Sequence, residues 1–333
     1  MDDLIAARLS MATSLGFHII FAAIGMSMPI LMTISHWKYL KSRKQDYLIL
    51  TKMWMKGTAI LFAVGAVSGT MLSFELGLLW PNFMKHAGPI IGMPFSWEGT
   101  AFFIEAIALG LYLYGWQRMS PWLHWWTGIA VAVSGFASGV FILAANAWMN
   151  SPQGFSFVDG SFTNIDPVEA MFNPAWLHQS LHMQVAAMQA VGLAVAGVHA
   201  FQILRKKNFS LNMRAFYMAA AMAASMSLIQ PLVGHFAAQR VAKLQPLKLA
   251  AFESHFETRS RAALSIGGIP NKEKGQLDYA LKLPGMLSFL AYNDIDAEVK
   301  GLNDFPKENW PPLLIVHLSF QLMVAIGTFL AIF

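Results

Sequence analysis

Long apolar runs separated by short polar stretches dominate this chain of 333 residues. Each run is about as long as the twenty apolar residues that a helix needs to cross roughly 30 Å of hydrocarbon. The pattern therefore predicts an all-α fold, a polytopic membrane helical bundle of about seven transmembrane helices. The expected spans are approximately 11–34, 53–79, 97–117, 122–148, 176–203, 214–238 and 311–333.

The composition agrees with a membrane protein, because only 12% of the residues are charged while 56% are hydrophobic. No linker or internal repeat divides the chain, so we expect a single membrane domain over 1–333, with 239–310 as a long polar loop between helices 6 and 7. The absence of cysteine excludes disulfides, thiolate-ligated haem and iron–sulfur clusters. The net charge of +5 forms no basic stripe, so no nucleic-acid partner is expected.

Basic residues concentrate in alternate connections, and this distribution predicts the orientation. The fourth connection, 149–175, has acidic residues and no basic one. The positive-inside rule then places the N-terminus and the 239–310 loop outside the cytoplasm. The basic residues of the first, third and fifth connections are Lys38, Lys41, Arg43, Lys44, Lys52, Arg118, Arg205, Lys206, Lys207 and Arg214.

Two histidines and one methionine stand out inside the apolar runs: His18 in the first span, His182 in the fifth and Met323 in the seventh. Ionisable residues in a membrane are functional candidates, because each costs about 2.5–3.5 kcal/mol on insertion scales. One interpretation makes His182 an axial haem ligand, with a methionine opposite it completing a low-spin site. The alternative is that each histidine only bonds a neighbouring helix, and we favour that role for His178, one turn from His182.

The third span carries two carboxylates, Glu98 and Glu105, seven residues apart and hence on one helical face. Glu98 lies near the expected interface, where simple solvation is an alternative. Glu105 lies deeper, and the pair indicates a proton route or an acid beside a haem.

The polar loop opens with "QPLKLAAFE", in which Lys248 and Glu253 lie on one short segment. A solvated surface charge pair is the simplest interpretation. The functional alternative is that the two residues bind the oxygens of a quinol head group, with Glu253 taking a proton.

These stretches together resemble subunit I of the cytochrome bd family of quinol oxidases. The similarity runs along nearly the whole chain, and "QPLKLAAFE" is its most specific part. The other stretches, in order, are "GFHIIF", "WEGTAFFIEA", "LAANAWMNSP", "NP" ahead of His182, and "FQLMVAIG".

The resemblance implies roles for particular residues. A low-spin haem b is held by His182 and Met323, and a high-spin haem (b or d, or one of each) takes His18 as ligand. The remaining implied roles are Glu98 beside the high-spin haem, Glu105 on the proton path, Lys248, Glu253 and Gln245 in the quinol site of the outer Q loop, and Arg8 at a haem propionate.

The implied protein is a terminal respiratory oxidase of a bacterial or archaeal cytoplasmic membrane. It takes electrons from quinol at the outer side and passes them through the low-spin haem to the high-spin haem, which reduces oxygen to water. This contributes to the proton gradient, because electrons and protons reach one site from opposite sides. A subunit II and possibly small accessory subunits are the implied partners.

Four departures from the family pattern keep alternatives open. The glutamate pair is one residue closer than usual, and Gln321 and His235 replace a basic and an acidic residue. The family continues for two further helices that carry a haem-ligating carboxylate, whereas this sequence stops at Phe333. The chain is therefore either a piece or a short relative. The rival functions are a quinol-oxidising cytochrome that does not reduce oxygen and a haem-free proton-coupled transporter.

Overall fold

Seven long helices make up most of the computed structural model, which describes residues 3–333. Each coincides with one of the seven apolar runs, so the predicted helical membrane bundle is confirmed. The helices are α1 (Asp3–Ser42), α2 (Gln45–Leu79), α3 (Pro81–Tyr114), α4 (Pro121–Asn150), α6 (Trp176–Leu204), α7 (Phe209–Leu244) and α10 (Leu313–Ile332).

Several helices extend well beyond the predicted spans. The 40 residues of α1 measure about 60 Å along the axis at 1.5 Å per residue. The hydrocarbon core takes up about half of that length. The apolar pattern marks only the part inside the lipid, whereas helical hydrogen bonding continues into the polar boundary.

Six of the seven long helices are long and apolar enough to cross a membrane, and α3 is the exception. It has 34 residues and two internal prolines, Pro89 and Pro94. Glu98 and Glu105 lower its hydropathy. Because α3 packs along α4 through Leu109 and Val131, we treat it as the remaining span.

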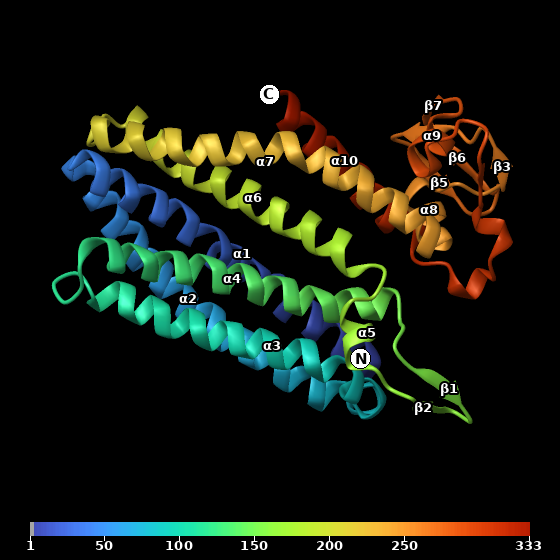
Figure 1. Cartoon of the computed structure of the whole chain (residues 1–333). Coiled ribbons are helices and arrows are strands. Elements are labelled where there is room, and N and C mark those ends of the chain that lie inside the picture. The colour runs from blue at the N-terminus through green and yellow to red at the C-terminus, as the bar shows by residue number, and fades with distance from the viewer. Residues whose placement is uncertain (1–2) are drawn as a thin grey trace. The chain divides into compact units, whose positions relative to one another are not determined.

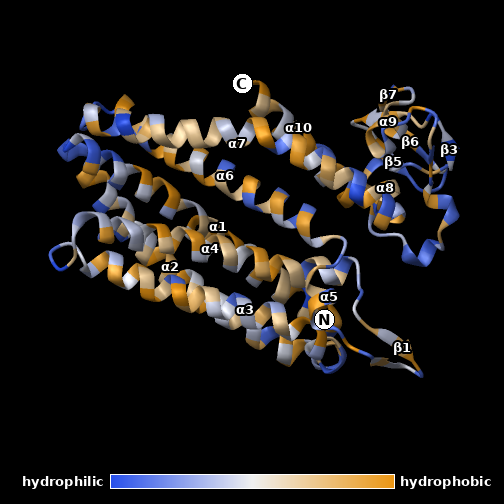
Figure 2. Cartoon of the chain, in the orientation of Figure 1, coloured by the Kyte–Doolittle hydropathy of each residue, from blue (hydrophilic) through white to orange (hydrophobic). Residues whose placement is uncertain are grey.

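The chain divides into two compact units, the first ending at Met226 and the second beginning at Ser227, within α7. In the first unit α1 contacts α2, α4 and α6, while α3 lies along α4 (Figure 1). The connections α1–α2, α3–α4 and α6–α7 lie at one end of this unit. Apolar residues follow the middle of the helices and hydrophilic ones gather at that end (Figure 2).

A short segment closes the other end of the first unit. It holds the hairpin of β1 (Ser156–Val158) and β2 (Ser161–Thr163), followed by α5 (Pro167–Met171). The Asp166 carboxylate caps α5 by accepting hydrogen bonds from two backbone amides. Ala170 of α5 packs on Ile90 and Trp148 and so ties this segment to α3 and α4.

The second unit contains a folded version of the expected polar loop. Ala262, Leu287 and Val299 are at most 3% exposed and form a small core. The sequence does not predict the strands of this unit, because each has only two or three residues, too few to show an alternating pattern. The elements are α8 (Pro246–Glu253), β3 (Arg259–Ser260), β4 (Leu264–Ile266), β5 (Ile269–Asn271), β6 (Gln276–Asp278), β7 (Leu281–Leu283), α9 (Met286–Tyr292) and β8 (Glu298–Val299), with antiparallel pairs β3–β8, β4–β7 and β5–β6, and 3-10 turns at Leu302–Asp304 and Lys307–Asn309.

Gly128 permits a close approach of three helices in the first unit. A Cβ atom at this position of α4 would lie 2.8 Å from Thr33 of α1 and 2.8 Å from the ring of Tyr112 of α3. Small residues at such crossings let membrane helices pack closely.

We expect Gly128→Ala to destabilise the protein although alanine is the better helix former by about 1 kcal/mol. Forcing a methyl group into a filled contact typically costs about 1–3 kcal/mol. Thermal unfolding in detergent measures the effect as a fall in Tm. The control is Gly110→Ala on α3, where nothing lies within 4 Å. Equal Tm values for the two variants would contradict the tight crossing.

Candidate functional site

His18 lies on the face of α1 that packs against α2. Its Nδ1 atom is 2.9 Å from the Ser68 hydroxyl, which restrains the imidazole ring. A Cβ atom on Gly69 would lie 3.0 Å from His18 Cε1, so the glycine leaves room for the ring. The ring is therefore held in one orientation, as a metal ligand requires.

Glu75 of α2 is a buried carboxylate that contacts α1 one to two turns before His18. The hydroxyls of Ser10 and Ser14 donate to Glu75 Oε1 at 3.1 and 2.8 Å. Glu75 is 8% exposed, and sequence reasoning missed it. The available signal in the sequence was a lone acidic residue within one apolar run and two serines four residues apart at the start of another. Arg8 lies exposed just before this seam.

Glu98 and Glu105 both face α4, in agreement with their spacing. The Ser138 hydroxyl donates to Glu98 at 3.3 Å. Glu105 is 5% exposed, and a Cβ atom on Gly135 would lie 3.0 Å from its Oε1. Glu105 is thus enclosed by protein, in agreement with the deeper position expected for it.

A further polar cluster lies on α3 seven residues beyond Glu105. The Tyr112 hydroxyl is 2.9 Å from His36 Nδ1, and His124 Nε2 is 2.8 Å from the Tyr112 carbonyl. All three side chains are at most 2% exposed. Sequence reasoning missed this cluster, because its members come from three helices.

His182 lies half-buried on α6, and His178 is 3% exposed. Two amide hydrogen bonds join this part of α6 to α4. Asn146 donates to Gln179 at 2.8 Å, and Gln184 donates to the Phe136 carbonyl at 3.0 Å. These bonds bracket His182 along the helix and fix its height against α4.

Met323 belongs to the second unit and is 49% exposed on α10. The pairing of Met323 with His182 stays a prediction.

Glu253 ends α8 and is 5% exposed. The backbone amide of Ser265 donates to its carboxylate, yet Oε2 has no hydrogen-bond partner among the described residues. Burial raises the pKa of Glu253 to about 7, against the lowering effect of the Ser265 hydrogen bond. Such a carboxyl exchanges a proton near neutral pH.

Lys248 lies on the same short helix, with its ammonium 5.9 Å from the centre of the Phe252 ring. Burial lowers its pKa. Gln245 precedes the first residue of α8, and its carbonyl accepts from the Lys248 amide at 2.9 Å. The burial of Glu253 does not fit a solvated surface charge.

Two side chains of α10 hold the segments around Glu253. His317, fully buried, has Nδ1 2.8 Å from the Phe252 carbonyl and Nε2 3.3 Å from the Gly267 carbonyl. Gln321 accepts from the Gly267 amide at 3.1 Å and donates to the Ser265 carbonyl at 3.0 Å. Gln321, in place of the family's basic residue, thus fastens the loop. Sequence reasoning missed His317.

The structure so far defines a helical membrane protein with buried imidazole and carboxyl groups in its bundle. Within residues 3–333 no three histidine or acidic side chains gather to hold a metal ion. Haem iron fits such an arrangement, because it needs only one or two axial side chains from the protein.

The family model for cytochrome bd terminal oxidase subunit I matches residues 6–333, so the chain belongs to that family. It is 37% identical to the "Putative cytochrome bd menaquinol oxidase subunit I" of Bacillus subtilis (strain 168), over 100% of this chain and 76% of that protein. It is 28% identical to the "Cytochrome bd-II ubiquinol oxidase subunit 1" of Escherichia coli (strain K12), over 98% of this chain and 64% of that protein.

A solved structure agrees in fold. The bd oxidase from Geobacillus thermodenitrificans matches with a TM-score of 0.94 and 39% identity, over 99% of this chain and 76% of that chain. The chain is thus subunit I of a quinol-oxidising terminal respiratory oxidase, an integral membrane enzyme that uses haem and works in a complex with a subunit II. This supports the oxidase over the two rival functions.

The buried carboxyl of Glu253 makes the stability of the folded protein depend on pH. Its folded-state pKa of about 7 exceeds the ordinary 4.5, so its contribution is full below pH 4.5 and is lost as pH rises through 7. The loss amounts to at most about 3 kcal/mol. We expect the difference in Tm between Glu253→Gln and the native protein to shift in favour of the variant as the pH rises from 5 to 8.

The control is Glu257→Gln, since Glu257 is exposed and follows in the same loop. The Tm of this variant should change with pH in the same way as that of the native protein. Parallel Tm profiles for the native protein and Glu253→Gln would show that the buried carboxyl does not titrate in this range.

Proposed function

We propose that quinol is oxidised against α8, with Lys248 and Gln245 binding the head-group oxygens and Glu253 accepting a proton. The observation that carries this proposal is the buried Glu253 carboxyl, whose Oε2 has no hydrogen-bond partner among the described residues. A quinol hydroxyl is a donor of the kind this oxygen lacks. Relatives bear menaquinol or ubiquinol in their names, and these residues address the head-group chemistry that both share.

His317 and Gln321 act as positioning residues in this proposal. They bind the backbone at 265–267 and at Phe252, next to the carboxyl that takes the proton. Because α10 also carries Met323, one helix both positions the backbone beside Glu253 and supplies the proposed low-spin haem ligand. This arrangement supports short-range electron transfer from α8 toward Met323.

The proposed haem ligands are His182 with Met323 for a low-spin haem b, and His18 for a high-spin haem of type b or d. Haem supplies one-electron transfer and, at an open axial position, oxygen chemistry. The Ser68 contact supports His18, because ligating histidines usually have their other nitrogen held by a polar group. Glu98 would lie beside that site, and Arg8 would pair with a propionate.

Protons for water formation are proposed to pass through Glu105. The cluster of His36, Tyr112 and His124 lies further along α3, toward the end where the basic connections gather. The positive-inside rule makes that end cytoplasmic and the N-terminus extracytoplasmic. Protons released at Glu253 outside and taken up through Glu105 inside add to the proton gradient.

The exposed apolar faces of the helices support a partner subunit. Ile60, Val67 and Phe74 of α2, spaced seven apart, are 67, 73 and 66% exposed. Such a stripe packs against lipid or another helix. Subunit II, and possibly small accessory subunits, would cover part of it.

Replacing His182 by alanine is expected to remove the α-band of the low-spin haem, because the iron loses its imidazole ligand. Reduced-minus-oxidised difference spectra of the purified complex measure this. His178→Ala is the matched control, one turn away on the same helix, and should keep the band. A normal band in the His182 variant would remove the ligand assignment.

Replacing Glu253 by glutamine is expected to lower kcat for quinol oxidation by about a hundredfold or more, in the range typical for a lost proton acceptor. The haem spectra should stay unchanged. Oxygen uptake with a soluble quinol measures the rate, and Glu257→Gln serves as control. Full activity in the Glu253 variant would place the proton acceptor elsewhere.

A further inference from the structure

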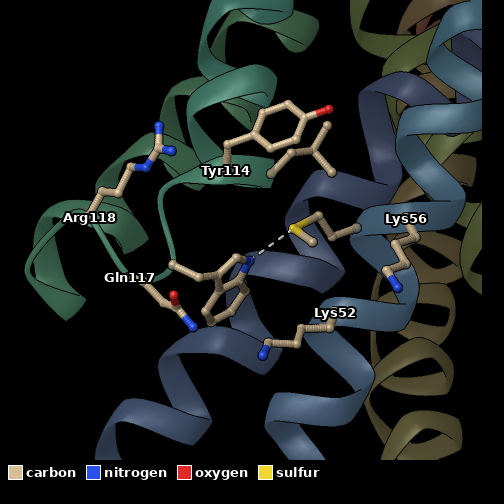
Figure 3. Close-up of a pocket in the computed structure, with 8 residues that line it drawn as sticks. Lys52, Lys56, Tyr114, Gln117 and Arg118 are labelled. Carbon is tan, nitrogen blue, oxygen red and sulfur yellow. Dashed lines mark hydrogen bonds between the residues drawn. The ribbon is translucent and has the colours of Figure 1, made fainter.

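We propose that a hollow between α2 and the α3–α4 turn binds the phosphate head group of an anionic membrane lipid. The hollow has a volume of about 440 Å³ (Figure 3). It lies within the first unit and shares no residue with the proposed haem and quinol sites. Its lining residues are Lys52, Met55 and Lys56 of α2, with Leu113, Tyr114, Trp116, Gln117 and Arg118 from the end of α3 and the turn.

The charged residues that line the hollow are all basic. Lys52, Lys56 and Arg118 line it, and no acidic residue does. The ion pairs found in residues 3–333 are Arg214 with Asp46 and Arg261 with Asp296, so no carboxylate of this part of the chain neutralises the three cations. An anion in the hollow would gain from all three.

The wall of the hollow is held in place before any ligand arrives. The Trp116 indole donates to the Met55 sulfur at 3.4 Å, which fastens the turn against α2. The Lys52 ammonium lies 5.0 Å from the centre of the Trp116 ring, within cation–π range. A preorganised site loses less entropy on binding.

The position along α2 points to a head group rather than to free phosphate. Lys56 follows the first residue of α2 by eleven positions, or about 17 Å. At 35 residues α2 is about 52 Å long, some 20 Å more than the hydrocarbon thickness. The hollow therefore lies near the boundary between water and lipid.

The apolar part of the lining completes the match. Leu113 offers an apolar surface for the first carbons of an acyl chain, and Tyr114 stands 77% exposed, as aromatic residues do at membrane boundaries. Basic pockets at helix ends on the cytoplasmic side bind anionic head groups. Inorganic phosphate would satisfy the cations and leave this surface unused.

The test is titration of the purified, delipidated complex with dioctanoyl phosphatidylglycerol, followed by native mass spectrometry. The variant combines Lys52→Gln, Lys56→Gln and Arg118→Gln. We expect it to bind the lipid roughly a hundredfold more weakly, at about fivefold per cation. The matched control removes the same charge from the α1–α2 connection at Lys41, Arg43 and Lys44, and should keep its affinity within about twofold.

Haem spectra and Tm of both triple variants verify that they fold. Equal lipid affinity in the native complex and the first variant would overturn the proposal. An equal loss in the control would show a diffuse charge effect instead of a site. Displacement of the lipid by inorganic phosphate at comparable concentration would show a phosphate site without lipid preference, and dioctanoyl phosphatidylcholine binding as tightly would exclude recognition of the anion.

Discussion

The cost of leaving a polar group unpaired in hydrocarbon is the constraint on which this structure depends. Helices satisfy the backbone, and the few polar side chains must then find partners on neighbouring helices. Ser68 meets His18, Ser138 meets Glu98, and two serines of α1 meet Glu75. Each pairing fixes the relative height of two helices. The candidate iron-binding and proton-binding side chains therefore also set how the helices align along their axes.

The same constraint takes another form in the polar loop. Glu253 is buried by protein and not by lipid, and one of its oxygens has no partner among the described residues. His317 and Gln321 meanwhile satisfy the backbone around it. Glu253 Oε2 therefore keeps its capacity to accept a hydrogen bond, although the neighbouring backbone is held by α10. A carboxyl in such a setting can accept a proton from a bound molecule, which is the chemistry that quinol oxidation requires.

Much of the fold follows from apolar run length alone. The seven runs match seven long helices, since only a helix hides its backbone over that length. Identity followed from local motifs, of which "QPLKLAAFE" is the most specific. The strands at 259–299 could not be predicted, because their two or three residues carry no period and their core comes from distant segments.

Some residues of the candidate site could likewise be predicted from the sequence, and others could not. Spacing along one helix is a local property, so the shared face of Glu98 and Glu105 was already determined by the sequence, as was the placement of His18 and His182 inside apolar runs. Glu75, His36, His124 and His317 became visible only in the tertiary structure, because their partners lie on other elements, up to 88 positions away for His36 and His124. The spacing of residues along a helix shows which face each side chain occupies. Which residues of other elements contact that face is decided only by the packing of the tertiary structure.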